Sequence, residues 1–170
     1  MARVLKEFKP ARIAVMTVSD SRTLADDTSG DYFVEQLQAE GHQLAERAIV
    51  ADNKYLIRAQ VSQWIADDSI QVVLISGGTG FTAKNYTTEA LMPLFDKPVE
   101  GFGEIFRMLS FEDIGSSSLQ SRAIAGMANQ TIIFAMPGST GACRLGWEKL
   151  IKEQLDARHR PCNFIPHLSI

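Results

Sequence analysis

Three short segments of small and hydroxyl-bearing residues are the parts of this 170-residue chain best suited to hold an anion. They lie at residues 17–20 (Thr-Val-Ser-Asp), 76–80 (Ser-Gly-Gly-Thr-Gly) and 137–140 (Pro-Gly-Ser-Thr). Glycine lets successive backbone N–H groups turn toward a ligand, while serine and threonine add hydroxyl donors. We therefore expect a phosphate-bearing small molecule, with these candidate ligand-binding residues: Ser19, Ser76, Gly77, Gly78, Thr79, Gly80, Pro137, Gly138 and Ser139.

Each segment follows a predicted strand. Residues 12–19, 72–75 and 131–136 are nearly continuous apolar runs rich in β-branched side chains, which is typical of strands buried on both faces of a parallel sheet. The carboxyl ends of parallel strands open on one edge of the sheet. The three segments are therefore expected to converge at that edge.

The remaining pattern alternates strands with helices. A capping segment at residues 27–31 precedes a helix that ends near Gly41, a strand covers residues 44–50, and Asp52 or Asn53 caps the next helix. Residues 87–121 are mainly helical, residues 123–127 form a further strand before a turn at Asn129, and a last helix covers residues 141–155. This alternation predicts a three-layer α/β/α domain with a mainly parallel sheet.

One domain accounts for the length. We expect an N-terminal extension at residues 1–10, the α/β domain at residues 11–155, and a C-terminal tail at residues 156–170 that packs on the domain or on a neighbouring subunit.

Composition excludes several classes of protein. Seventeen basic and twenty acidic residues give a net charge of -3, which argues against a nucleic-acid partner. No stretch approaches the roughly 20 apolar residues that a membrane span needs, and the N-terminal residues lack the apolar core of a secretion signal. Only two cysteines occur, Cys143 and Cys162. These features predict a cytoplasmic protein that does not enter a membrane.

Four carboxylates near the same edge are candidates for holding a magnesium ion that bridges phosphates: Asp20, Asp26, Asp27 and Asp52. A helix cap or a solvated loop is the alternative role for each. Asp52 stands out because it follows a predicted strand directly. None of the three histidines falls in the three small-residue segments, so the usual general base is missing there.

The order of short motifs along the chain resembles the MoaB/MogA family of molybdenum cofactor biosynthesis proteins, and the MoaB branch in particular. The motifs are Thr17-Val-Ser19, Asp27-Thr-Ser-Gly30, Ser76-Gly-Gly-Thr-Gly80, Thr88-Glu-Ala90, Gly101-Phe-Gly-Glu104, Phe106-Arg-Met-Leu-Ser-Phe111, Pro137-Gly-Ser139 and Arg160-Pro-Cys-Asn-Phe164. The resemblance implies a molybdopterin-binding fold, a homotrimer or hexamer, and a ligand with a terminal phosphate on a pterin dithiolene. It also implies contact with other proteins of the pathway.

Residue roles follow from the same resemblance. In adenylylating members the pterin phosphate attacks the α-phosphate of Mg-ATP. Gly77, Gly78 and Thr79 match the phosphate loop, and the resemblance implies a role in catalysis and in Mg²⁺ binding for Asp52. Asn85 stands where the family usually has a second aspartate, and Thr88 replaces a proline.

Four functions stay open at this point. They are a MoaB-type protein that binds molybdopterin or a related pterin phosphate, an active molybdopterin adenylyltransferase, a non-catalytic oligomeric pterin carrier or interaction protein, and a phosphate-binding domain outside this pathway. Asn85 separates the second from the third, because a missing carboxylate argues for weak or no adenylyl transfer.

Overall fold

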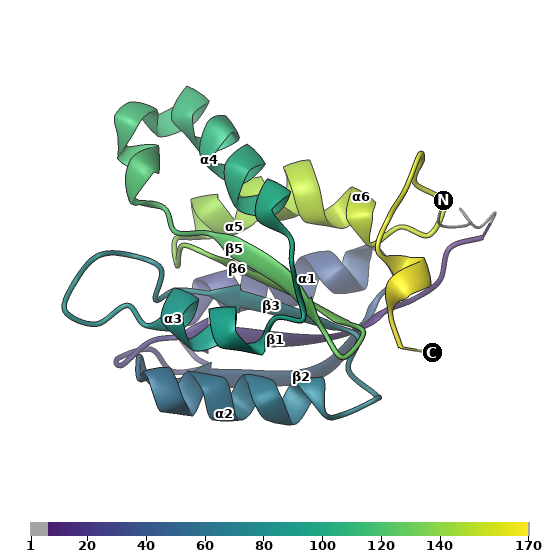
Figure 1. The fold of residues 1–170 in the computed structure, drawn as a ribbon, viewed down its shortest axis with the longest axis horizontal. Coiled ribbons are helices and arrows are strands. Elements are labelled where there is room, and N and C mark those ends of the chain that lie inside the picture. The colour runs from purple at the N-terminus through teal and green to yellow at the C-terminus, as the bar shows by residue number, and fades with distance from the viewer. Residues whose placement is uncertain (1–6, 170) are drawn as a thin grey trace.

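Six strands form one mixed sheet in this computed structural model, which describes residues 7–169 (Figure 1). Their spatial order is β2-β1-β3-β6-β5-β4. The first four strands in that order pair in parallel, whereas β5 and β4 are antiparallel to their neighbours. The strands are β1 (Arg12–Val18), β2 (Gln43–Val50), β3 (Val72–Ser76), β4 (Lys97–Pro98), β5 (Ile124–Ala128) and β6 (Thr131–Met136).

Helices cover both faces of the sheet and complete the three layers. On one face, Phe33, Phe106 and Trp147 pack against the sheet from α1, α4 and the C-terminal helical segment. On the other face, Ile57, Trp64 and other apolar residues of α2 and α3 fill a second core. The predicted α/β/α architecture is confirmed. The helices are α1 (Thr28–Ala39), α2 (Lys54–Ile65), α3 (Thr87–Leu91), α4 (Glu100–Ile114), α5 (Thr140–Gly146) and α6 (Lys152–Gln154).

Local sequence signals set several boundaries. Asp27 caps α1 by accepting a hydrogen bond from Gly30 N, and Gly41 follows the end of α1 with a φ of +91°, which glycine adopts without strain. Asn53, not Asp52, caps α2, because its Oδ1 accepts hydrogen bonds from the amides of Tyr55 and Leu56. The side chain of Asp52 is thereby left for another role.

The middle of the chain contains more than the predicted helices. A single-turn 3₁₀ helix at Met92–Leu94 leads into β4, a two-residue strand that the sequence analysis did not predict. A longer 3₁₀ segment, η2 (Gly115–Gln120), follows α4. The predicted last helix contains a π-helical turn, Trp147–Ile151, between α5 and α6.

Residues 156–169 pack against the same domain. Leu168 is 5% exposed and belongs to the core, the ring of Phe164 lies 6.2 Å from that of Phe134, and Ser169 N donates to Gln130 O. Within residues 7–169, no helix is long and apolar enough to cross a bilayer. The expectations for residues 1–6 and 170 fall outside the described residues.

Candidate ligand-binding site

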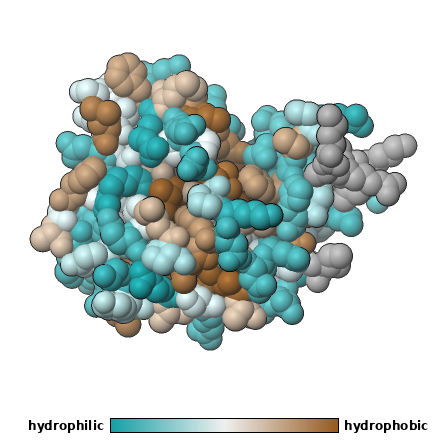
Figure 2. Space-filling view, in the orientation of Figure 1, coloured by the Kyte–Doolittle hydropathy of each residue, from teal (hydrophilic) through white to brown (hydrophobic). Residues whose placement is uncertain are grey.

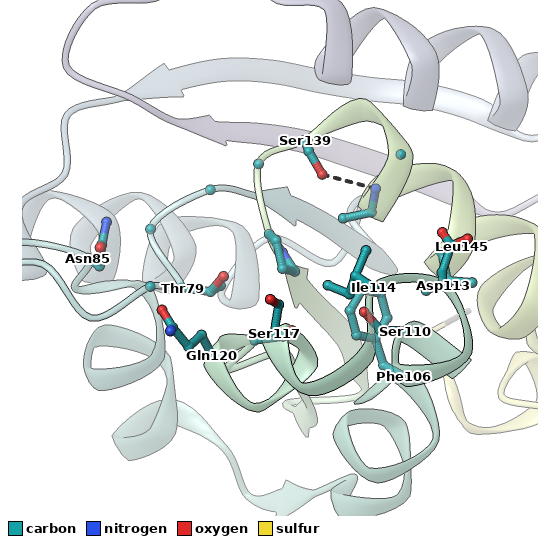
Figure 3. Close-up of a pocket in the computed structure, with 18 residues that line it drawn as sticks. Thr79, Asn85, Phe106, Ser110, Asp113, Ile114, Ser117, Gln120, Ser139 and Leu145 are labelled. Atoms are coloured by element: carbon teal, nitrogen blue, oxygen red, sulfur yellow. Dashed lines mark hydrogen bonds between the residues drawn. The ribbon is translucent and has the colours of Figure 1, made fainter. Parts of the chain in front are cut away.

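A cavity of about 530 Å³ opens where β3 and β6 end (Figure 3). Residues 77–80, which follow β3, and residues 137–139, which follow β6, form one side of it. The other side comes from α4, from η2 and from the start of α5. Figure 3 shows Ser110, Ile114 and Ser117 opposite Ser139, with Thr79 and Gln120 at one end of the space between them.

Residues 77–80 form a glycine-rich loop, and all four of its backbone carbonyl groups accept hydrogen bonds from Thr87 or Arg122. Thr87 donates its hydroxyl to Gly77 O at 2.8 Å and its amide to Gly78 O at 3.0 Å. The Nε–H of Arg122 donates to Thr79 O at 3.2 Å and to Gly80 O at 3.0 Å. Four consecutive carbonyls are therefore bonded to Thr87 and Arg122, neither of which lines the cavity.

The amides of the same four peptides face the other way. In a planar trans peptide the C=O and N–H groups point in opposite directions, so the N–H groups of residues 78–81 point away from Thr87 and Arg122. Residues 78–80 line the cavity, whereas Phe81 does not. None of these four N–H groups donates a hydrogen bond to any residue within 7–169. Such a row of unpaired donors is an anion-binding concavity.

Glycine is required in this loop for two reasons. Gly77 and Gly78 have φ angles of +95° and +70°, a region that side chains strain. A Cβ at Gly77 would lie 2.4 Å from Val18 O, and one at Gly78 would lie 2.1 Å from Thr87 Oγ1. The loop therefore packs against β1 and α3 with no room for a side chain.

The second loop is fitted closely to the first. A Cβ on Gly138 would lie 3.2 Å from the Cα of Gly77, and the hydroxyl of Ser29 donates to Gly138 O at 2.8 Å. Ser139 Oγ accepts a hydrogen bond from Ala142 N at 3.1 Å and caps α5, as the dashed line in Figure 3 marks. Its hydroxyl hydrogen stays available to a ligand.

A buried carboxylate supports this edge of the sheet from below. Asp27, 2% exposed, accepts hydrogen bonds from Thr17 Oγ1 at 2.8 and 2.9 Å and from Gly30 N at 3.0 Å, and pairs with Arg47 at 3.0 Å. Thr17 also lies 3.5 Å from the hydroxyl of Ser76. Asp27 thus links β1, α1 and β2 beneath the loops.

Asp52 lies behind the glycine-rich loop and not in the cavity wall. Its Oδ2 accepts from Asn85 N at 2.9 Å and from Asn85 Nδ2 at 3.2 Å, and its Oδ1 accepts from Tyr86 N at 2.9 Å. Asn85 has a φ of +64°, and its Oδ1 accepts hydrogen bonds from both the amide and the hydroxyl of Thr82. Asp52 and Asn85 therefore hold residues 82–86 in place.

These contacts do not make a magnesium cage. Both oxygens of Asp52 already accept N–H groups, and Oδ2 of Asp20 pairs with Lys84, whose hydrogen bond lowers the pKa of the Asp20 carboxyl. Among residues 7–169 no group of three or more histidine, cysteine or acidic side chains is placed to hold a metal. Mg²⁺ in nucleotide sites is held by one or two carboxylates together with phosphate oxygens and waters, so a site here would use these carboxylates with the nucleotide and not a protein cage.

The candidate residues from the sequence divide into two groups. Gly77, Gly78, Thr79, Gly80, Asn85, Pro137, Gly138 and Ser139 line the cavity. Ser76 is fully buried beneath it, and Ser19 accepts hydrogen bonds from the amides of Ser21 and Arg22 in its own turn. The structure therefore places Ser19, Ser76 and Asp52 outside the cavity lining.

The residues of the cavity wall that faces the two loops were not predicted from the sequence. Phe106, Ser110, Asp113 and Ile114 come from α4, while Ser117, Gln120 and Ser121 belong to η2 or directly follow it. These residues carry no local signal for binding, since only the tertiary fold brings α4 over the carboxyl ends of the strands. Arg122 was missed for the same reason.

No nucleophilic thiol serves the site. Cys143 lies close by on α5, but burial raises the pKa of its thiol to about 12, so the group stays neutral near pH 7. The cavity offers backbone amides, hydroxyl groups, the carboxylate of Asp113 and an apolar wall.

The protein is a three-layer α/β domain whose cavity lies at the carboxyl ends of parallel strands, where α/β proteins of this class bind their ligands. A family model described as probable molybdopterin binding domain matches residues 14–157. The chain belongs to the MoaB/MogA family of molybdenum cofactor biosynthesis proteins.

Related sequences and solved structures support the same family assignment. The chain is 63% identical over 168 residues to molybdenum cofactor biosynthesis protein B of Escherichia coli (strain K12), covering 99% of both chains. A crystal structure of a molybdenum cofactor biosynthesis protein B superposes with a TM-score of 0.84 at 44% identity, covering 86% of this chain and 92% of the other. The tungsten cofactor synthesizing protein MoaB from Pyrococcus furiosus gives 0.75 at 34% identity, with 86% and 93% covered.

Proposed function

We propose that this protein binds molybdopterin, or a closely related pterin phosphate, in the cavity between the two small-residue loops. The observation that carries the proposal is the row of backbone N–H groups on the cavity-lining residues 78–80, which have no partner within residues 7–169. Family membership supplies the chemical class of the ligand.

The cavity suits a ligand with one anionic end. Among residues 7–169 no lysine or arginine lines the cavity, so a phosphate would be held by neutral N–H donors and hydroxyl groups. The opposite wall combines the apolar side chains of Phe106, Ile114 and Leu145 with the polar ones of Ser117 and Gln120. An apolar wall with a few polar groups fits a flat heterocycle, and the cavity volume lies in the range of small-molecule sites.

Titration of the purified protein with molybdopterin, with and without Mg-ATP, tests this proposal. We expect saturable binding without nucleotide, and competition by excess inorganic phosphate if the phosphate occupies the loop. Failure of molybdopterin to bind at micromolar concentrations would reject the proposed function.

We further infer that adenylyl transfer from Mg-ATP is weak in this chain, because Asn85 brings an amide to the carboxylate of Asp52. Replacement of Asn85 by aspartate sets two carboxylates about as close as the present 3.2 Å contact, an arrangement that attracts a divalent cation. We expect pyrophosphate release, measured with molybdopterin and Mg-ATP, to rise on the order of 100-fold.

Asn129→Asp is the matched control for this experiment. Asn129 also has a positive φ, but it lies in the β5–β6 turn at the end of β6 opposite the cavity. Robust turnover by the parent protein, unchanged in Asn85→Asp, would show that position 85 does not limit the reaction.

We also propose that the protein assembles as a homotrimer or hexamer through α4 and η2. Large apolar side chains are exposed there: Ile105, Met108, Phe111, Ile114 and Leu119, from 42% to 77%. Figure 2 shows apolar side chains projecting over α4 and a further apolar band across the same face. Several large apolar side chains exposed on one helix and the segment that follows it favour an interface there.

Light scattering on the eluate of a sizing column measures the assembly. We expect a mass of three or six chains for the parent and a monomer for the double variant Met108→Glu, Phe111→Glu. Leu24→Glu is the control, because Leu24 is 60% exposed but lies in the loop after β1. A monomeric parent at micromolar concentration would reject this assembly.

A further inference from the structure

We propose that Arg122 is a positioning residue that holds the N–H donors of the glycine-rich loop turned into the cavity. The inference rests on the proposed pterin-phosphate function and concerns the same site. Arg122 does not line the cavity and lies behind the loop, between η2 and β5.

One guanidinium group holds three backbone carbonyls of the loop. Its Nε–H is shared between Thr79 O at 3.2 Å and Gly80 O at 3.0 Å, and Nη2 donates to Asn85 O at 2.8 Å. The two ends of residues 79–85 are thus fastened to the same planar group. A planar fork of five donors is what allows an arginine to serve several acceptors at once.

The contacts with the carbonyl groups also fix the direction of the N–H groups that could bind a ligand. Because each carbonyl points to Arg122, the N–H of the following residue points the opposite way. Polarisation of a carbonyl by a cationic donor also strengthens the N–H of the same peptide as a hydrogen-bond donor. Arg122 therefore acts on an anion in the cavity through the amide of Gly80, which lines it, and orients the neighbouring amide of Phe81.

The third peptide shows this geometry directly. Asn85 O accepts from Arg122, and the N–H of the same peptide, on Tyr86, donates to Asp52 Oδ1 at 2.9 Å on the opposite side. The peptide is held between a cation and a carboxylate. The amides of Gly80 and Phe81 are turned in the same manner, but their N–H groups have no partner within residues 7–169.

The guanidinium is itself held in one orientation. Nη1 pairs with Glu89 of α3, and the ring of Phe81 lies 5.0 Å from the guanidinium carbon. The side chain of Arg122 is 22% exposed. A lysine could keep the pair with Glu89, but its compact ammonium cannot reproduce the fork.

The decisive variant is therefore Arg122→Lys, which preserves the charge. Arg12→Lys is the matched control, because Arg12 also donates to two backbone carbonyls, those of Ser69 and Asp68, at the opposite end of the sheet. Two properties are measured: the backbone ¹⁵N order parameters of residues 79–81 in the ligand-free protein, and the dissociation constant for molybdopterin.

In the parent and in Arg12→Lys we expect order parameters near the ~0.85 of rigid backbone. In Arg122→Lys we expect them to fall to about 0.6 or lower, and the dissociation constant to rise about 10-fold or more. Millimolar methylguanidinium should partly restore binding to Arg122→Ala and leave Arg12→Ala unchanged, an effect that a general loss of folding would not show.

The outcomes separate the two proposals. If the parent does not bind molybdopterin, the proposed function fails, and the order parameters alone then decide the role of Arg122. Unchanged order parameters in Arg122→Lys would overturn the positioning role. A parent that binds, together with an Arg122→Lys variant that binds equally well, would overturn it too.

Discussion

Valine in place of Gly78 is expected to weaken molybdopterin binding on the order of 100-fold or more, which corresponds to ~3 kcal/mol. The φ of +70° at Gly78 strains any branched side chain, and its Cβ would lie 2.1 Å from Thr87 Oγ1 and 3.1 Å from Val18 Cγ1. The loop must move away from Thr87, which breaks the bonds that orient its carbonyls. Isothermal titration measures the loss.

A matched glycine controls for general effects of the substitution. Gly101 lies in α4, and a Cβ placed there meets no atom within 4 Å, so Gly101→Ala should bind like the parent. Circular dichroism and the melting temperature establish that Gly78→Val is folded. A folded Gly78→Val with parental affinity would show that the ligand lies elsewhere.

Removal of the Asp27 carboxylate is expected to destabilise the domain strongly. Asp27→Ala leaves Thr17 and Gly30 N without their acceptor and Arg47 without its buried partner, while Arg47 Nε already has none. Breaking a buried ion pair from one side costs about 3–5 kcal/mol. For a chain of this size that lowers the melting temperature by roughly 6–20 °C.

Asp31→Ala separates this effect from the loss of a surface charge. Asp31 pairs with the same arginine at 2.8 Å, but its side chain is 50% exposed, so its removal should cost less than about 1 kcal/mol. Calorimetry on the two variants measures the difference. Equal melting temperatures would mean that Asp27 does not support the edge of the sheet.

The sequence predicted those elements whose signals are local. The apolar runs of β1, β3 and β6 lie within a few residues of their predicted positions, and so do the caps around α1 and α2. Strand β4 was not predicted, because its two residues, Lys97 and Pro98, are too few to show a pattern of hydrophobic residues. The π-helical turn at Trp147–Ile151 was not predicted either, since its apolar spacing resembles that of an ordinary helix.

For the candidate site, the sequence indicated the loops but not what surrounds them. Residues 76–80 and 137–140 were predicted because they are rich in glycine, serine and threonine, and most of them line the cavity. Asp52, predicted from the resemblance to act in catalysis and Mg²⁺ binding, accepts hydrogen bonds from the backbone amides of Asn85 and Tyr86, 33 and 34 residues further along the chain. Long-range contacts of this kind leave no trace in spacing.

Strand β4 has a consequence for how copies of this protein can meet. A long strand at the edge of a sheet offers free N–H and C=O groups to other chains and promotes aggregation. Here the edge strand has two residues, Lys97 and Pro98; proline has no N–H to offer, and Val99 N already donates to Ala125 O of β5. This edge therefore offers almost no backbone to a strand of another copy and resists β-type aggregation.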